Sequence, residues 1–211
     1  WPARAKRLIE LIEKLGIIPQ RIDLGGGLYG NMAESLKEQF NTKIPEYKDY
    51  ANAVAPIFAE KFKDAEYCPE LLIEPGSALV GDCMRFASTV KTIKTVREKT
   101  FVSVLGSQKN ISMSGVNPPM TVYSLKDDQQ DVNKAEIDGY TCIETDVLYK
   151  NYTRKIARGD MVVFENCGSY SLVMKPPFIL PNFPVLDISE GKTEVIKRAE
   201  TFEDIFRTYN M

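Results

Sequence analysis

The first 84 residues alternate between helix-like and strand-like segments, and this alternation constrains the fold more than any other feature of the chain. Apolar side chains recur at helical spacing over residues 2–15 and again over residues 47–62, where Pro56 predicts a kink. The first helix is followed by a short strand over Arg21–Leu24, and LLIEPGS contains a second strand. Helix, strand, helix, strand is the order of βα units with a parallel sheet.

Near residue 85 the sequence pattern changes from alternating helix and strand to mainly β. The rest of the chain contains short β-rich runs separated by Gly, Pro or Asn, namely STVKTIKTV, TFVSVLGS, MTVYSL, GDMVVFEN, YSLVM and TEVIKR. Thr201 and Asp204 fit a capping box for a short final helix. We therefore predict two domains, an α/β domain over residues 1–84 and a mainly β domain over residues 85–211.

Composition limits the chemistry and the partners. The chain has 27 Lys and Arg against 29 Asp and Glu, which gives no reason to expect nucleic acid or an anionic membrane as a partner. It has no His, so Ser/His/Asp triads are excluded and any acid or base is Cys, Tyr, Lys, Asp or Glu, or belongs to a cofactor. Four cysteines lie far apart without a CxxC pair, and no run approaches the length of a transmembrane helix. This pattern predicts a reduced, cytoplasmic protein without a metal site.

Three consecutive glycines, Gly25, Gly26 and Gly27, directly follow the first predicted strand. Residues without a Cβ allow successive backbone N–H groups to face one anion, so this turn is a candidate phosphate site. It matches neither the Walker loop nor the GxGxxG pattern of dinucleotide sites. A plain flexible turn is the alternative interpretation.

Three other residues are candidates for chemistry. Glu74 follows the second strand at a Pro/Gly turn, where α/β folds place reacting groups, although a solvated loop acid is the more common interpretation on local grounds. Cys142 lies in GYTCIETDVLY, which has little hydrophobic bulk, although a lone Cys is more often a small buried hydrophobe. Tyr170 follows a Gly-Ser step and is either a site residue or a half-buried strand residue.

Taken in order, RIDLGGG, LLIEPGS, GYTCIETD, GDMVVFENCGSY and VIKRAETFEDIF resemble the pyridoxal-phosphate-dependent decarboxylases of the alanine-racemase-like fold. That family includes the diaminopimelate, ornithine and arginine decarboxylases, and the tail is most similar to the diaminopimelate branch. The resemblance covers essentially the whole chain but only the later part of the family's chain. It implies the last strands and helices of a (β/α) barrel that binds pyridoxal phosphate, followed by a C-terminal β-sandwich or Greek-key domain. It also implies a head-to-tail homodimer with a shared active site.

The resemblance implies a role for each matching residue. The glycines at 25–27 would hold the cofactor phosphate, and Glu74 would pair with the pyridine nitrogen and keep the ring an electron sink. Cys142 would reach the cofactor from the partner subunit and protonate the carbon after CO₂ leaves, and Tyr170 would hydrogen-bond the phosphate. Gly76 and Ser77 would also bind the cofactor, and Glu144 and Tyr123 would bind the substrate.

Three departures from the family pattern argue against diaminopimelate as the substrate. Ser77 replaces the arginine of EPGR, so a charge-assisted contact becomes at most a hydroxyl contact. Ile143 stands where an acid usually follows the cysteine, with Glu144 one place later. The RPxLY-type segment is NPPMTVY, which keeps Tyr123 without an arginine. The expected substrate is therefore a different basic or siderophore-type amino acid.

The family's Schiff-base lysine and cofactor-stacking histidine lie on early barrel strands, upstream of the segment that this sequence matches. We therefore expect a fragment of a carboxy-lyase that is inactive alone. Two alternatives stay open: a catalytically silent relative that serves as a protein-interaction module, and a phosphate-binding β/α protein without pyridoxal chemistry. Retention of Glu74, Cys142 and Tyr170 favours the enzyme.

Overall fold

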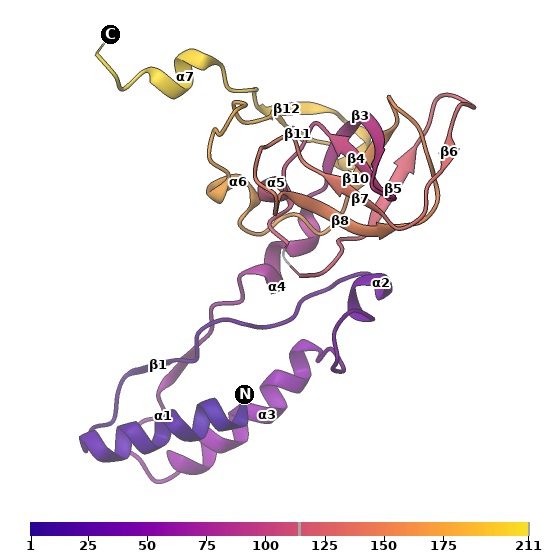
Figure 1. The fold of residues 1–211 in the computed structure, drawn as a ribbon. Coiled ribbons are helices and arrows are strands. Elements are labelled where there is room, and N and C mark those ends of the chain that lie inside the picture. Colours follow the sequence, from indigo (N-terminus) through magenta and orange to yellow (C-terminus); the bar gives the residue numbers. More distant parts are fainter. Residues whose placement is uncertain (114, 211) are drawn as a thin grey trace. The chain divides into compact units, whose positions relative to one another are not determined.

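The computed structural model describes residues 1–113 and 115–210, and the chain divides into two compact units. The first unit comprises Trp1–Arg85 and Glu165–Ser169, and the second comprises Phe86–Phe164 and Tyr170–Met211. The chain therefore passes through the six-stranded sheet of the second unit, contributes five residues to the first unit, and then completes the second. Figure 1 colours the chain by residue number, from indigo at the N-terminus to yellow at the C-terminus.

The first unit contains two long helices and a parallel strand pair. In chain order its main elements are α1 (Pro2–Leu15), β1 (Arg21–Asp23), α3 (Tyr47–Lys61) and β2 (Glu70–Leu72). The strands pair in parallel, with Ile22 opposite Leu71, so the predicted order and strand direction are confirmed. Gly16 ends α1 in the left-handed conformation at φ 63°, and Pro56 lies inside α3. Three short elements complete the unit: α2 (Glu34–Lys37), α4 (Ser77–Val80) and the 3₁₀ turn η1 (Gly81–Cys83).

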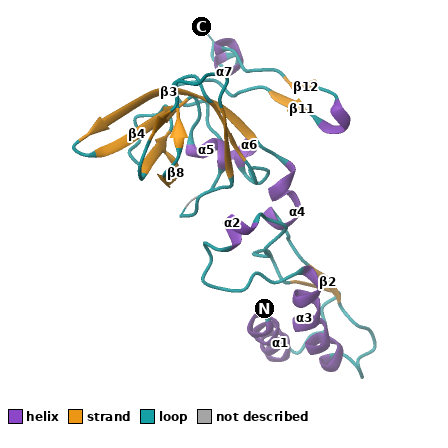
Figure 2. Ribbon diagram, turned by 90° about the vertical axis from the view of Figure 1, so that its right-hand side faces the viewer, coloured by secondary structure: helices purple, strands orange, loops and turns teal. Residues whose placement is uncertain are grey.

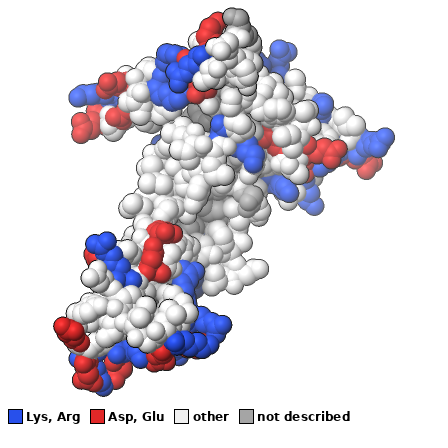
Figure 3. Space-filling view, turned by 90° about the vertical axis from the view of Figure 1, so that its left-hand side faces the viewer, with Lys and Arg blue, Asp and Glu red and all other residues white. Residues whose placement is uncertain are grey.

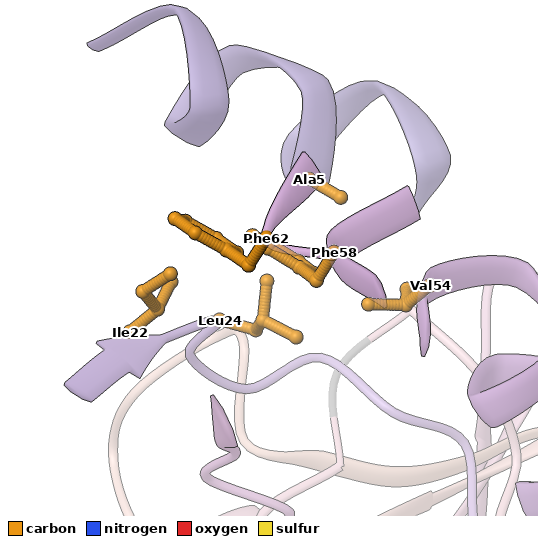
Figure 4. Packing of buried hydrophobic residues seen from close by; sticks show 6 residues of the cluster. All are labelled: Ala5, Ile22, Leu24, Val54, Phe58 and Phe62. Carbon is orange, nitrogen blue, oxygen red and sulfur yellow. The ribbon is translucent and has the colours of Figure 1, made fainter. Parts of the chain in front are cut away.

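A small hydrophobic core joins β1 to both long helices. Figure 4 shows its buried side chains converging between the strand and the helices: Ala5, Ile22, Leu24, Val54, Phe58 and Phe62. Phe58 is 2% exposed, and burying a side chain of this size contributes about 2–3 kcal/mol. Leu24 is the last residue before the three glycines, so this core fixes where the glycine turn begins.

The second unit is built on a six-stranded sheet with the order β5-β10-β3-β4-β7-β8. Figure 2 draws strands in orange and labels β3, β4 and β8 of this sheet. All neighbouring strands are antiparallel except β4 and β7. Val102, Ile137 and Val162 are fully buried on three of these strands. The strands are β3 (Phe86–Val96), β4 (Lys99–Val104), β5 (Met120–Tyr123), β7 (Ala135–Asp138), β8 (Val147–Tyr152) and β10 (Met161–Phe164).

Shorter elements surround this sheet. Two strand pairs lie outside it, β6 (Gln130–Asp131) with β9 (Lys155–Ile156) and β11 (Val185–Asp187) with β12 (Glu194–Lys197). The remaining elements are α5 (Gln108–Ile111), α6 (Ser171–Met174), η2 (Ser189–Gly191) and α7 (Phe202–Phe206). The predicted capping box of the last helix is confirmed, because the Thr201 side chain accepts from the backbone of Asp204 and the Asp204 side chain accepts from that of Thr201. The β-rich runs that contain β3, β4, β5, β10 and β12 are confirmed as strands.

One β-rich run, YSLVM, was interpreted wrongly. Residues 171–174 form α6, and the Met174 N–H donates to the Tyr170 carbonyl at 3.1 Å, as in a helical turn. Its apolar side chains Leu172, Val173 and Met174 are all more than half exposed, so they do not pack in the core as those of a buried strand would. A short apolar run does not distinguish a strand from a helical turn, and here the backbone satisfies its hydrogen bonds locally.

Charged side chains of both signs are interspersed on the visible surface of the first unit's helices (Figure 3). No single-sign patch stands out there, in keeping with the net charge of −2. Within the part of the chain that the structure describes, no helix combines the length and apolarity needed to cross a bilayer.

Candidate active site

The backbone of the three glycines packs closely against the segment that follows β2. The Glu74 N–H donates to the Gly25 carbonyl at 3.0 Å. A Cβ on Gly26 would lie 2.6 Å from the Glu74 carbonyl oxygen, and a Cβ on Gly30 would collide with the backbone of Ala78. Residues 25–30 and 74–78 therefore run side by side, and at both positions the close approach requires glycine.

Two of the three glycine amides are available to an anion. The Gly25 N–H is already used, because it donates to Asp23 Oδ1 at 2.8 Å. Among the described residues, the N–H groups of Gly26 and Gly27 meet no protein acceptor. Gly27 has φ 87°, the left-handed conformation that suits a turn of this kind. The turn thus fits a phosphate through Gly26 and Gly27, whereas the Gly25 amide maintains the turn itself.

Arg4 holds the outer side of the glycine turn. Its Nη1 donates to the carbonyl oxygens of Leu24 and Gly26, both at 2.8 Å. Its guanidinium carbon lies 4.6 Å from the centre of the Trp1 ring. In a trans peptide the C=O of one residue and the N–H of the next point in opposite directions. By drawing the Gly26 carbonyl towards itself, Arg4 directs the Gly27 N–H to the opposite side of the turn. Arg4 could not be predicted from the sequence, since nothing in its neighbourhood along the chain indicates this contact.

Glu74 lies two residues after β2 and is exposed. None of the salt bridges in the described part of the chain involves it, so its carboxylate is not engaged by a cation of this chain. Gly76, at φ 47°, and Ser77 follow directly at the start of α4, and both are exposed. The predicted cofactor-binding residues of the first unit are thus gathered at one place.

In the second unit, Cys142 and Glu144 lie on the loop that connects β7 to β8, and both are exposed. The alternative of a small buried hydrophobe therefore does not apply to Cys142, although it does apply to Cys167, which is 2% exposed. Two backbone bonds close the loop: Gly139 N–H to the Asp146 carbonyl at 2.7 Å, and Asp146 N–H to the Ile143 carbonyl at 2.9 Å.

The two tyrosines of the predicted site are also in the second unit. Tyr123 ends the edge strand β5 and is 56% exposed. Tyr170 precedes α6 in the left-handed conformation at φ 61° and is 58% exposed, so it is not a half-buried strand residue. A non-glycine residue in this conformation is a strained position of the type found at functional sites.

A cavity of about 230 Å³ lies beside the Cys142 loop and is lined by Tyr140, Thr141, Ile143 and Lys175, among others. Lys175 is 7% exposed, and its Nζ donates to the carbonyl oxygens of Pro176 at 3.1 Å and Leu180 at 3.4 Å. Burial lowers the pKa of this ammonium group. Sequence analysis did not single out Lys175, because nothing in the sequence indicates its burial.

Asp138 immediately precedes the same loop. Burial, with a smaller contribution from Glu136, raises the pKa of its carboxyl to about 6. Glu136 is itself paired with Lys99 at 2.8 Å. The described residues contain no cluster of three or more Cys, Asp or Glu side chains able to hold a metal ion.

Comparison with known families accounts for most of the chain. Residues 3–81 match the family model described as pyridoxal-dependent decarboxylase, pyridoxal binding domain, and residues 78–168 match that of the C-terminal sheet domain of the same enzymes. The diaminopimelate decarboxylase of Methanothermobacter thermautotrophicus is 27% identical over 210 residues, which cover 94% of this chain and 46% of that protein. That of Corynebacterium efficiens is 28% identical over 216 residues, covering 95% and 46%.

Solved structures share the fold. A diaminopimelate decarboxylase from Helicobacter pylori, complexed with L-lysine, superposes with a TM-score of 0.73 at 22% identity and covers 98% of this chain and 49% of its own. The arginine decarboxylase of Paramecium bursaria Chlorella virus has a TM-score of 0.63 at 19% identity, covering 84% and 47%. The predicted fold class, part of a pyridoxal-phosphate barrel followed by a β domain, is confirmed. The chain spans about half the length of these relatives.

Proposed function

Because the chain belongs to the pyridoxal-dependent decarboxylase family, whose cofactor is pyridoxal phosphate, we propose that it forms part of the active site of an amino-acid carboxy-lyase. The observation that carries this proposal is the glycine turn packed against the Glu74 segment, with two unengaged amides and an unpaired carboxylate. The relatives are about twice as long as this chain, so the proposal concerns the activity of the whole protein that contains it.

The residues of the first unit fit the cofactor. The N–H groups of Gly26 and Gly27 would hold the phosphate, with Gly76 and Ser77 as further contacts, and Glu74 would hold a proton on the pyridine nitrogen. When bound, pyridoxal phosphate supplies the electron sink for the pair left on the α-carbon as CO₂ departs.

The residues of the second unit would supply the proton and orient the substrate. The Cys142 thiol is proposed to give its proton to the α-carbon, replacing the departed carboxylate, and to regain one from water. Tyr170 is proposed to donate a hydrogen bond from its hydroxyl to the phosphate. Glu144 and Tyr123 are proposed to orient the substrate. The exposure of all four side chains supports these roles.

The substrate is proposed to differ from diaminopimelate. Ser77 and Ile143 remove an arginine and an acid that a diaminopimelate enzyme is expected to carry, so a different basic or siderophore-type amino acid is proposed. The whole protein is further proposed to be a cytoplasmic head-to-tail homodimer in which Cys142 serves the partner's cofactor. Four free cysteines agree with a reducing compartment.

The test measures CO₂ release from a panel of amino acids by the whole protein loaded with pyridoxal phosphate. Glu74→Gln is expected to lower the rate on the best substrate about a hundredfold or more, because the ring loses its charged partner. Glu66→Gln, at an exposed acid of the same unit, is the matched control and should retain the rate. Fastest turnover of meso-diaminopimelate would overturn the substrate proposal. A protein that releases no CO₂ and retains no cofactor would favour the interaction-module alternative.

A further inference from the structure

We infer that Asp146 is a positioning residue, which fixes the loop that carries Cys142 and Glu144; this inference rests on the proposed function. The Asp146 side chain is buried, with the residue 6% exposed. Its Oδ1 accepts from Ser107 Oγ at 2.8 Å and from the Gln108 N–H at 2.6 Å. Its Oδ2 accepts from the Thr141 N–H at 3.2 Å and from the Thr141 hydroxyl. One carboxylate therefore accepts four hydrogen bonds.

These bonds tie the Cys142 loop to a distant part of the chain. Ser107 and Gln108 begin α5, almost forty residues earlier, whereas Thr141 is the immediate neighbour of Cys142. A further backbone bond, from the Tyr140 N–H to the Gly106 carbonyl at 2.9 Å, runs parallel to this connection. No cation pairs with Asp146 among the salt bridges of the described residues, so its buried charge depends on these donors.

The glycine at the start of the loop makes room for this carboxylate. A Cβ built on Gly139 would overlap the carboxylate oxygens of Asp146. Gly139 and Asp146 thus close the two ends of the GYTCIETD motif around Cys142. The motif is a structural unit whose geometry depends on a residue without a Cβ at one end and an acceptor of four hydrogen bonds at the other.

A fixed loop matters because proton delivery depends on the position of the donor atom. Displacing a reacting group by about 1 Å can cost up to a hundredfold in rate. The Cys142 side chain is exposed and has no hydrogen bond of its own in the described structure, so its position follows that of the loop backbone. Asp146 therefore acts through the loop and not on the substrate.

Asp146→Asn is the informative variant. Each carboxylate oxygen accepts from one backbone N–H, that of Gln108 at Oδ1 and that of Thr141 at Oδ2. A backbone N–H cannot become an acceptor, so the new amide group faces a donor in either orientation. Hydrogen exchange of residues 139–146 and of Gln108 should accelerate about tenfold or more. In the loaded whole protein kcat should fall about 10- to 100-fold, with KM and cofactor retention within about threefold.

Asp160→Asn is the matched control. Asp160 is also buried, at 3% exposed, and accepts from the Ala157 N–H at 2.8 Å and from Gln129 Nε2 at 3.0 Å, but none of its bonds reaches the Cys142 loop. Both donors bind the same oxygen, Oδ2, so the oxygen of the new amide can accept both bonds. This variant removes a buried carboxylate elsewhere in the second unit and should leave exchange of residues 139–146 and kcat unchanged. Equal kcat losses in the Asp146 and Asp160 variants would reduce the role of Asp146 to general stability and overturn the inference.

Ser107→Ala keeps the test decisive if Asp146→Asn does not fold. It removes one donor and leaves both backbone bonds, so it should shift exchange and kcat in the same direction by a smaller factor. Faster exchange with an unchanged kcat overturns the positioning role and leaves the proposed function intact. Unchanged exchange overturns the anchoring itself. A wild-type protein without decarboxylase activity overturns the proposed function, and with it a catalytic role for the loop.

Discussion

Arg4 Nη1 donates to the Gly26 carbonyl oxygen at 2.8 Å and so links the first turn of α1 to the centre of the glycine turn. The same atom binds the Leu24 carbonyl, so two carbonyls of the turn face the arginine and the Gly27 N–H faces away from it. A turn that offers amides to a phosphate has to keep its carbonyl oxygens away from the same anion, and Arg4 satisfies that requirement.

Replacing Arg4 by Met should therefore weaken cofactor binding. We expect the dissociation constant for pyridoxal phosphate to rise about tenfold, since bonds from a charged donor contribute about 1.5–3 kcal/mol and water replaces them in part. Fluorescence titration of the whole protein measures this constant. Arg7→Met is the matched control, because Arg7 lies on the same helix and, among the residues that the structure describes, pairs only with Glu10 at 3.0 Å. Equal affinities in the two variants would contradict the role given to Arg4.

Gly26→Ala should separate the two segments of the proposed cofactor site. The added Cβ would meet the Glu74 carbonyl oxygen at 2.6 Å, so the segment carrying Glu74 has to move. We expect a stability loss of about 1–3 kcal/mol and at least a tenfold loss in cofactor affinity. Gly81→Ala is the control, since a Cβ there lies 3.4 Å from Asn166 Nδ2, at the end of a side chain that can move. Urea unfolding and cofactor titration compare the two, and a tolerated Gly26→Ala would refute the close packing.

Cys142→Ala should remove the proposed proton donor without removing the cofactor. We expect kcat to fall about 10²- to 10⁴-fold, the range for loss of a general acid, while bound pyridoxal phosphate is unchanged. Cys83→Ala, at an exposed cysteine of the first unit, is the control and should retain activity. Single-turnover CO₂ and product assays would show whether both products still form, and normal turnover by Cys142→Ala would exclude the thiol as donor.

Asp138 predicts a pH dependence of stability. Burial raises its pKa from 3.8 to about 6, so between these values the folded protein binds more protons than the unfolded chain. Its contribution to stability is therefore fully present below pH 3.8 and is lost as the pH rises through about 6. Asp138→Asn should raise the free energy of unfolding at pH 7 by about 1 kcal/mol, a value reduced for solvent screening of a half-buried group.

Urea midpoints between pH 4 and pH 8 measure this effect, with Asp131→Asn, at an exposed acid of the same unit, as the control. The difference between Asp138→Asn and wild type should grow with pH. A constant difference would mean that the Asp138 pKa is the same in the folded and unfolded states.

Local patterns in the sequence were enough to predict the elements that have local causes. The bounds of α1 follow from helical spacing of Leu8, Ile12 and Leu15 and from the Gly16 cap, and they are confirmed. The strand β7 was missed because AEID alternates over only four residues, and β8 was missed because VLYKNY does not alternate between apolar and polar residues.

The candidate site residues with a local signature or a family match, such as the glycine turn, Glu74 and Cys142, could be proposed from the sequence, and their roles stay predictions. Arg4 and Asp146 could not be, because their partners lie 22 and 39 residues away and only the folded chain brings them together. Their residue types carry no signal of these contacts.

We propose above that the glycine turn and Glu74 hold pyridoxal phosphate in a working active site. The most direct measurement adds the cofactor to the whole protein, removes the excess, records the visible absorbance, and maps lysine adducts by mass spectrometry after borohydride reduction. We expect a retained absorbance band, one modified lysine, and loss of the band in Gly26→Ala. A protein without the band and without an adduct would contradict this proposal and would make the chain a relative that has lost the cofactor chemistry.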